Sequence, residues 1–135
     1  MEITKETDYA VRCILYLARC SGETPVMIET IAAEMCIPRS FLAKILQKLA
    51  RAEIVKSFRG VKGGFQLSRS PSELSLLSVV EAIEGPIAMN RCTIDPQRCD
   101  FRDTCTVHPV WKTLQRLVVD YLGKTRFDTM MQCRK

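Results

Sequence analysis

The chain has 135 residues, of which 47% are hydrophobic and 26% are charged, and a formal net charge of +5. This length allows one compact domain with an additional element for association, and the composition excludes a disordered chain. No apolar run reaches the roughly 18 residues of a membrane-spanning helix, and the first residues lack the apolar core of a signal peptide. We therefore expect a cytoplasmic protein with no membrane partner.

The first part of the chain predicts two helices. Apolar residues recur at helical spacing from Asp8 to Cys20, and Thr4 or Thr7 is available as the N-terminal cap. A shorter helix is expected from about Met27 to Cys36. Pro38 prevents its continuation, because proline lacks an amide donor and disfavours helix in the residue before it.

The helical pattern is clearest from Ser40 to Ala52. One face of this segment is apolar, with Phe41, Leu42, Ile45, Leu46 and Leu49. The other face is polar and mostly basic, with Lys44, Gln47, Lys48 and Arg51. A short helix, a tight break and a second helix with a basic outer face are typical of a helix-turn-helix.

Two short strands are predicted next, over Ile54–Phe58 and Phe65–Leu67. The connection between them, residues 59–64, contains three glycines, which allow positive φ angles and a close approach of another backbone. Arg59 and Lys62 lie at the tip of this hairpin. A hairpin directly after a recognition helix is the wing of a winged helix.

The remainder of the chain predicts two more helices around an irregular segment. Apolar residues from Leu76 to Ile83 mark a helix that ends at Gly85 and Pro86, and residues 87–106 lack periodicity. From Val107 to Gly123 the helical pattern resumes. Its apolar stripe is longer than one small winged domain can cover, so we expect a second copy of the chain to cover it.

These elements define a mainly α fold with a small β-hairpin wing and a long C-terminal dimerisation helix. We divide the chain into a winged helix-turn-helix DNA-binding domain (residues 1–85), a cysteine-rich loop (86–106), and a dimerisation helix with a tail (107–135).

The positive charge is concentrated in the helix and hairpin. Residues 39–69 contain eight lysines and arginines and one acid, Glu53, so this segment carries +7 and the remainder of the chain −2. Such asymmetry indicates a face that binds a polyanion, although a solvated basic surface would give the same count.

Double-stranded DNA is the expected partner of this segment. Lys and Arg neutralise phosphates, and side chains at the start of the recognition helix reach base edges. We expect base contacts from Arg39, Ser40 and Lys44, while Phe41 either touches a thymine methyl or packs inward. Arg59 suits a narrow minor groove. The other residues expected at DNA are Lys48, Gly60, Lys62 and Gly63. For Lys48, and likewise for Arg51, a solvated helix face is the alternative.

Seven cysteines are present, and their odd number argues against a disulfide framework. Cys92, Cys99 and Cys105 lie in the irregular segment, and His108 follows three positions later. Thiolates suit iron–sulfur clusters and zinc, but the spacing is looser than that of structural zinc knuckles. Spacing alone leaves open a cluster, a zinc ion, or a redox-active or inert set of thiols. The other four cysteines need no special role.

Two further functions agree with parts of the sequence. Cys105 and His108 would be a nucleophile and a base in an enzyme, but no oxyanion donors or substrate-binding signature accompany them, and we expect no enzyme. A cluster-free DNA-binding regulator that responds to a small molecule or a partner protein is the alternative function.

Several motifs together resemble those of the IscR-like family of bacterial iron–sulfur regulators. They are Ile3-Thr4, Asp8-Tyr9-Ala10-Val11-Arg12, Phe41-Leu42-x-Lys44-Ile45-Leu46-x-x-Leu49, Arg59-Gly60-x-x-Gly63-Gly64-Phe65-x-Leu67 and the three cysteines. The likeness covers residues 1 to about 130. It implies a homodimer of winged-helix subunits, crossed by the long helix, with a cluster loop near the dimer axis. Operator affinity would then depend on a cluster that senses iron and sulfur status, redox conditions or nitric oxide.

The resemblance implies two sets of cluster ligands. Likeness to IscR-type members implies Cys92, Cys99, Cys105 and His108 around a [2Fe–2S] cluster. Likeness to NsrR-type members implies the three cysteines with Asp8 of the partner's first helix around a [4Fe–4S] cluster. RirA-type members have a similar sequence in that first helix. Asp8 is otherwise an acid that stabilises the first turn of its own helix.

Overall fold

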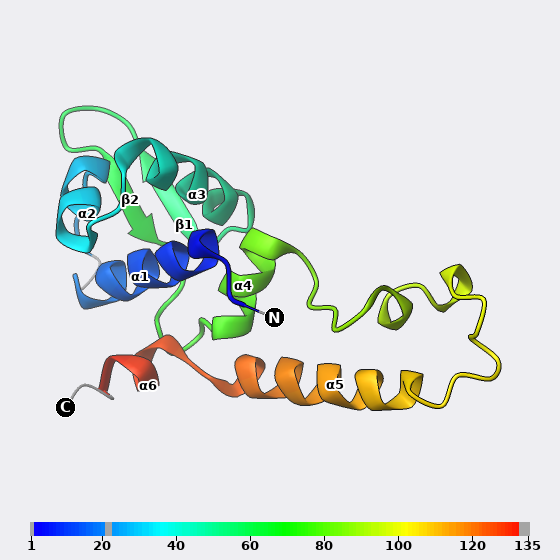
Figure 1. The fold of residues 1–135 in the computed structure, drawn as a ribbon. Coiled ribbons are helices and arrows are strands. Elements are labelled where there is room, and N and C mark those ends of the chain that lie inside the picture. Colours follow the sequence, from blue (N-terminus) through cyan, green and yellow to red (C-terminus); the bar gives the residue numbers. More distant parts are fainter. Residues whose placement is uncertain (1, 21–22, 133–135) are drawn as a thin grey trace.

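The computed structural model describes residues 2–20 and 23–132 (Figure 1). The helices are α1 (Lys5–Arg19), α2 (Ile28–Met35), α3 (Arg39–Arg51), α4 (Leu76–Glu84), α5 (His108–Lys124) and α6 (Phe127–Gln132). The strands are β1 (Val55–Phe58) and β2 (Gly64–Leu67), and the short 3-10 turns are η1 (Arg91–Thr93) and η2 (Pro96–Arg98). The mainly helical fold with a two-stranded hairpin is thus confirmed. None of the described helices is long and apolar enough to span a membrane.

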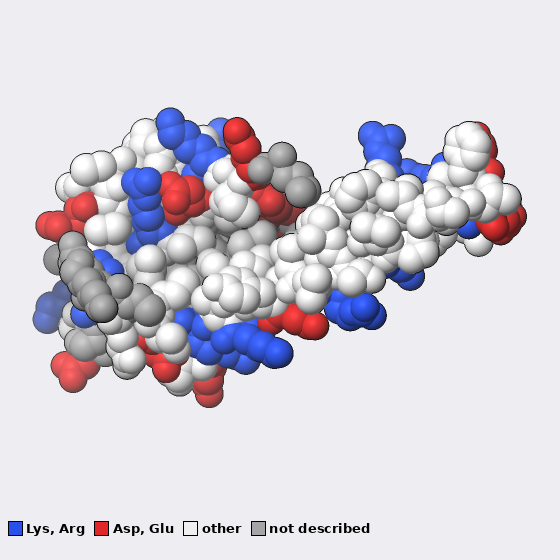
Figure 2. All heavy atoms as spheres, turned by 60° about the horizontal axis from the view of Figure 1, so that its bottom comes forward, with Lys and Arg blue, Asp and Glu red and all other residues white. Residues whose placement is uncertain are grey.

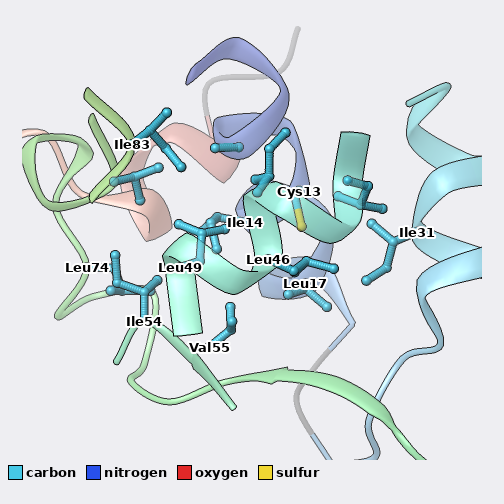
Figure 3. Close-up of a cluster of buried hydrophobic side chains, with 14 of the residues drawn as sticks. Cys13, Ile14, Leu17, Ile31, Leu46, Leu49, Ile54, Val55, Leu74 and Ile83 are labelled. Carbon is cyan, nitrogen blue, oxygen red and sulfur yellow. The ribbon is translucent and has the colours of Figure 1, made fainter. Parts of the chain in front are cut away.

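The helices α1 to α4 and the hairpin enclose one hydrophobic core. Each contributes the apolar face that its sequence periodicity predicts. Figure 3 shows Ile14 of α1, Ile31 of α2 and Leu46 of α3 in this cluster, and all three are completely buried. Because α3 packs against α1, α2 and α4, one face of this helix is fixed in the core and the opposite face must be exposed.

Short-range hydrogen bonds explain where the first helices begin and end. The Thr4 hydroxyl accepts a hydrogen bond from the Thr7 amide at 3.2 Å, so Thr4 is the N-terminal cap of α1. At the end of α2, Cys36 adopts a left-handed conformation with φ 55°. Pro38 then provides the break before α3, as the sequence predicts.

The hairpin pairs β1 and β2 in antiparallel register, with Val55 opposite Leu67. Phe65 also exchanges two backbone hydrogen bonds of 2.8 Å with Val26, so the segment before α2 lies against the wing. Gly64 is required at this contact. Its φ is +144°, and a Cβ atom there would lie 2.3 Å from the Val26 carbonyl oxygen.

The chain does not end in a simple tail after α5. The backbone turns at Thr125, and α6 folds back so that Phe127 is completely buried in the core. The Leu76 amide donates to the Thr125 carbonyl at 2.8 Å, and the Phe127 amide donates to the Leu74 carbonyl at 3.1 Å. Our sequence analysis assigned no element here, and α6 therefore adds to the winged-helix unit.

The cysteine-rich segment and α5 extend to one side of the winged-helix unit as an arm (Figure 1). The helix α5 contains no buried residue. Its large apolar side chains are widely exposed, including Val110 (56%), Leu117 (60%) and Tyr121 (73%). The face of the arm that Figure 2 brings forward is largely uncharged. One copy of the chain therefore leaves the predicted apolar stripe uncovered.

Candidate nucleic-acid interface and candidate metal centre

The outer face of α3 carries a polar stripe along its whole length. Leu42, Ile45, Leu46 and Leu49 are completely buried. With 100° per residue, the exposed side chains at Ser40, Lys44, Gln47 and Arg51 line up opposite this apolar face. Sequence reasoning included Ser40 and Lys44 among the DNA contacts and left Arg51 open between a DNA contact and a solvated helix face. It left out Gln47, although the spacing of Gln47 from Ser40 was the available signal.

Two predicted contact residues of α3 face α1 instead of pointing straight outward. The Lys48 ammonium lies 2.6 Å from the Glu6 carboxylate, and both side chains are partly buried. The Phe41 ring makes an edge-to-face contact with Tyr9, at 5.6 Å between ring centres, and is 38% exposed. Phe41 thus combines packing with partial exposure. The charge of Lys48 is balanced within the chain.

Arg39, the first residue of α3, faces α2. Its guanidinium lies 3.1 Å from the carboxylate of Glu29 on α2. A hydrogen bond from its own backbone, and then the one from Arg39, hold the pKa of Glu29 below its ordinary value. Both groups are largely exposed, so the pair orients Arg39 beside the start of α3 more than it stabilises the fold.

The wing presents its cations on a tight turn. The Gly63 amide donates to the Gly60 carbonyl at 3.0 Å, and a Cβ atom on Gly63 would lie 2.5 Å from the Phe58 carbonyl oxygen. Only glycine fits there. Arg59 and Lys62 are both exposed at this tip, where the sequence predicts them.

Local hydrogen bonds shape the cysteine-rich segment. The Asn90 side chain accepts from the Arg91 amide at 2.8 Å and caps η1, and the Asp95 side chain accepts from the Gln97 amide at 3.2 Å and caps η2. The Met89 amide also donates to the Gln115 side chain of α5 at 3.2 Å. The segment is thus built from short turns that are attached to the arm helix.

The four residues predicted as ligands meet at one cavity. Cys92, Cys99, Cys105 and His108 all line a small cavity of about 30 Å³, together with Pro96 and Arg102. The three cysteines also line a wider hollow of about 480 Å³ that reaches Trp111. His108 is the first residue of α5, in the first turn, as the sequence predicts.

The donor set at this cavity consists of three thiols and one imidazole. Within residues 2–20 and 23–132, no three Cys, His, Asp or Glu side chains already stand at the spacing of one metal ion's ligands. A closed zinc site needs four donors around a single ion, whereas the ligands of a cluster surround a larger group of irons and sulfides. Three thiols and an imidazole at one cavity are ligand types found both in zinc sites and around iron–sulfur clusters.

The remaining cysteines and Asp8 lie elsewhere. Cys13 is in the core, where burial raises the pKa of its thiol to about 12, so it is unreactive at neutral pH. Cys20 and Cys36 are in the winged-helix unit, and Cys133 lies outside the described residues. Asp8 is on α1, where its carboxylate pairs with Arg12 at 2.8 Å. Within one chain Asp8 does not line either cavity at the cysteines.

An exposed basic stripe on the second helix of a helix-turn-helix, followed by a glycine wing, defines a winged-helix DNA-binding transcription regulator. Residues 3–133 match the Rrf2 family, described as iron-dependent transcriptional regulators, and the chain belongs to this family.

Curated relatives and solved structures agree with this assignment. Protein aau3 of Rhizobium meliloti (strain 1021) is 37% identical, over 93% of this chain and 87% of its own length. The HTH-type transcriptional regulator IscR of Pectobacterium carotovorum is 29% identical, over 97% of this chain and 79% of its own length. The structure of CymR, the global cysteine regulator of B. subtilis, matches with a TM-score of 0.83 at 21% identity, over 100% and 99% of the two chains, and supports the fold.

Proposed function

We propose that this chain acts as a homodimeric transcription regulator whose affinity for operator DNA is controlled by an iron–sulfur cluster. The single observation that carries the proposal is the cavity lined by Cys92, Cys99, Cys105 and His108. The family's description as iron-dependent regulators supports it. In this proposal residues 86–106, together with His108 at the start of α5, hold the cluster, α5 forms the dimer, and the winged-helix unit binds DNA.

DNA binding in this proposal uses the outer stripe of α3 and the wing tip. Ser40 and Lys44 face outward and would enter the major groove, with Arg39 and Phe41 at the edges of the contact. Arg59, Gly60, Lys62 and Gly63 would approach the backbone and the adjacent minor groove. Lys48 would act at longer range, since Glu6 already balances its charge.

The dimer in this proposal forms through α5. A helix with no buried residue and several exposed apolar side chains is stable only when another apolar surface covers it. A second copy supplies an identical stripe and would set the separation of two α3 helices. Two half-sites about one duplex turn apart would then be bound together.

The connection between the two sites would run through the arm. A bound cluster would supply an iron- and redox-responsive centre. Its ligands would hold the segment from Cys92 to His108 in one conformation. Just before this segment, the Met89 amide donates to the Gln115 side chain and so connects the segment to α5. Loss of this order would change how α5 holds the two winged-helix units, and so change DNA affinity.

The first experiment tests the cluster. Anaerobically purified protein is expected to contain iron and acid-labile sulfide and to absorb visible light, and Cys99→Ser should abolish the absorption. Cys36→Ser, at the C-terminal cap of α2, is the matched control and should keep it. If the wild-type protein contains neither iron nor sulfide, the cluster-free regulator becomes the better description. Full colour in Cys99→Ser would remove Cys99 from the ligands.

The second experiment tests the fourth ligand. Mössbauer spectra of anaerobic wild-type protein distinguish [2Fe–2S] from [4Fe–4S]. Because His108 lines the cavity and Asp8 of the same chain does not, we expect His108→Ala to change the spectrum. A change with Asp8→Ala instead would indicate that the partner's α1 supplies the ligand.

A further inference from the structure

Gln47 is the neutral side chain in the middle of the exposed stripe of α3. It lies one helical turn from Lys44 on one side and one turn from Arg51 on the other. All three side chains are exposed. In the described part of the chain, the side-chain carboxamide of Gln47 makes no hydrogen bond to another residue. Its NH2 group and its oxygen are therefore available to a ligand.

The neighbours of Gln47 allow a close approach to a ligand. Ala43 precedes it by four residues and Ala50 follows it by three. Both side chains are only a methyl group, so they do not project past Gln47 from the helix surface. The longer cations Lys48 and Arg39 are drawn aside to Glu6 and Glu29. A flat surface that lies against the outer stripe would therefore meet the amide of Gln47 without obstruction.

The chemistry of this amide suits base recognition more than charge neutralisation. A carboxamide has no charge to attract phosphate, but it donates and accepts in one plane and can pair with N6 and N7 of adenine in the major groove. Arg51, one turn further along the stripe, can contact a phosphate that borders the same groove. Affinity and base selection are thus carried by adjacent residues of the stripe.

We propose that Gln47 is a specificity-determining residue that recognises an adenine in each half-site, with Arg51 as its flanking phosphate contact. This inference rests on the proposed binding of DNA by α3. It extends the base-reading surface past Lys44, the last residue of α3 that the sequence analysis expected to contact bases.

The test uses the full-length protein as purified anaerobically and a library of random-sequence duplexes. Selection with the wild type defines the preferred site, and titrations against single-base variants measure discrimination at each position. Gln47→Ala should lose roughly 5- to 150-fold discrimination at one position of each half-site and keep the other preferences. Gln47→Glu should shift the preference at that same position from adenine toward cytosine, whose N4 amino group donates to a carboxylate.

Arg51→Ala is the matched control on the same stripe. It should weaken binding to all sequences, lower the slope of log affinity against log salt by about one, and leave base preferences unchanged. If Gln47→Ala and Gln47→Glu keep every wild-type preference, the inference is wrong while DNA binding stands. If the wild type retains no duplex in a salt-sensitive way, the proposed function itself fails.

Discussion

The Glu84 carboxylate accepts a hydrogen bond of 2.7 Å from the hydroxyl of Thr7, which is completely buried. The same oxygen accepts from the hydroxyl of Thr4 at 2.8 Å and from its amide at 3.3 Å. The last residue of α4 is thereby attached to the first turn of α1. Because the cysteine-rich segment begins directly after Glu84, this contact joins the base of the arm to the winged-helix unit.

The contact predicts a pH-dependent contribution to stability. Hydrogen bonds from Thr7 and then from Thr4 lower the pKa of Glu84 from its ordinary value of 4.5. The ionised carboxylate therefore stabilises the fold above about pH 4.5, and this contribution is lost as the pH falls through the lowered pKa. Glu84→Gln should unfold at lower urea concentration than the wild type at pH 7.

The difference between Glu84→Gln and the wild type should shrink on acidification below pH 4.5, as followed by urea titration at each pH. Glu81→Gln, on an exposed position of the same helix, is the control. A difference that stays constant down to pH 3 would show that the charge of Glu84 contributes nothing.

Removal of the Phe127 side chain should destabilise the whole winged-helix unit. Phe127 is completely buried, and truncation of a buried phenylalanine to alanine typically costs about 3–5 kcal/mol. Urea unfolding of Phe127→Ala monitored by circular dichroism measures this loss. Thr129→Ala, at an exposed position of α6, should change the free energy of unfolding little. Equal stability of the two variants would mean that α6 does not pack on the core in solution.

The ion pairs on α3 predict unequal roles for two lysines. Lys44→Met should lower the salt dependence of DNA binding by about one unit of slope, because Lys44 faces outward and no acidic partner balances its charge in the described part of the chain. Lys48→Met should change the slope less, since the Lys48 ammonium lies 2.6 Å from Glu6. Affinities measured by fluorescence anisotropy between 50 and 200 mM salt check this order. The reverse order would place Lys48 at the DNA.

The wing predicts a contribution to binding that is separate from α3. Arg59→Ala should weaken operator binding by about 1–3 kcal/mol if its guanidinium enters the minor groove. The measurement is a titration of the preferred site and of variants in its flanking A·T-rich positions. Unchanged affinity together with unchanged preference in the flanks would exclude Arg59 from the interface.

The uncovered stripe of α5 and the proposed dimer together predict that a single charge on this stripe should favour the monomer. Leu117 is 60% exposed in one chain and lies among the apolar residues of α5. Leu117→Glu would bury a carboxylate in a dimer interface and should shift the protein toward the monomer in sedimentation equilibrium. Arg116→Ala, at the adjacent exposed position, should leave the assembly unchanged. A dimeric Leu117→Glu protein would locate the interface elsewhere.

Local rules were sufficient for most of the fold. The apolar periodicity of α1, α3 and α4, the Thr4 cap and the glycine hairpin all follow from interactions between residues close in sequence, and the structure confirms them. The convergence of Cys92, Cys99, Cys105 and His108 on one cavity was also expected from their order and from the family resemblance.

Long-range contacts account for what was not predicted. The helix α6 has only six residues, too short to form alone, and exists because Phe127 enters a core built by residues more than 40 positions earlier. The pairing of Lys48 with Glu6 spans 42 positions. Neither contact leaves a periodic signal in the sequence. The sequence analysis therefore counted Lys48 on the DNA-facing surface of α3, although Lys48 pairs with Glu6 beside that surface.

The exposed state of α5 has a consequence for the dynamics of the molecule. Since its apolar side chains lack cover in a single chain, the amide protons of α5 should exchange with solvent faster as the protein is diluted, while those of α3 should keep their protection at every concentration. Dilution would then loosen the region that carries the cysteines before it affects the helix that faces DNA. The response of the protein would therefore depend on its own concentration.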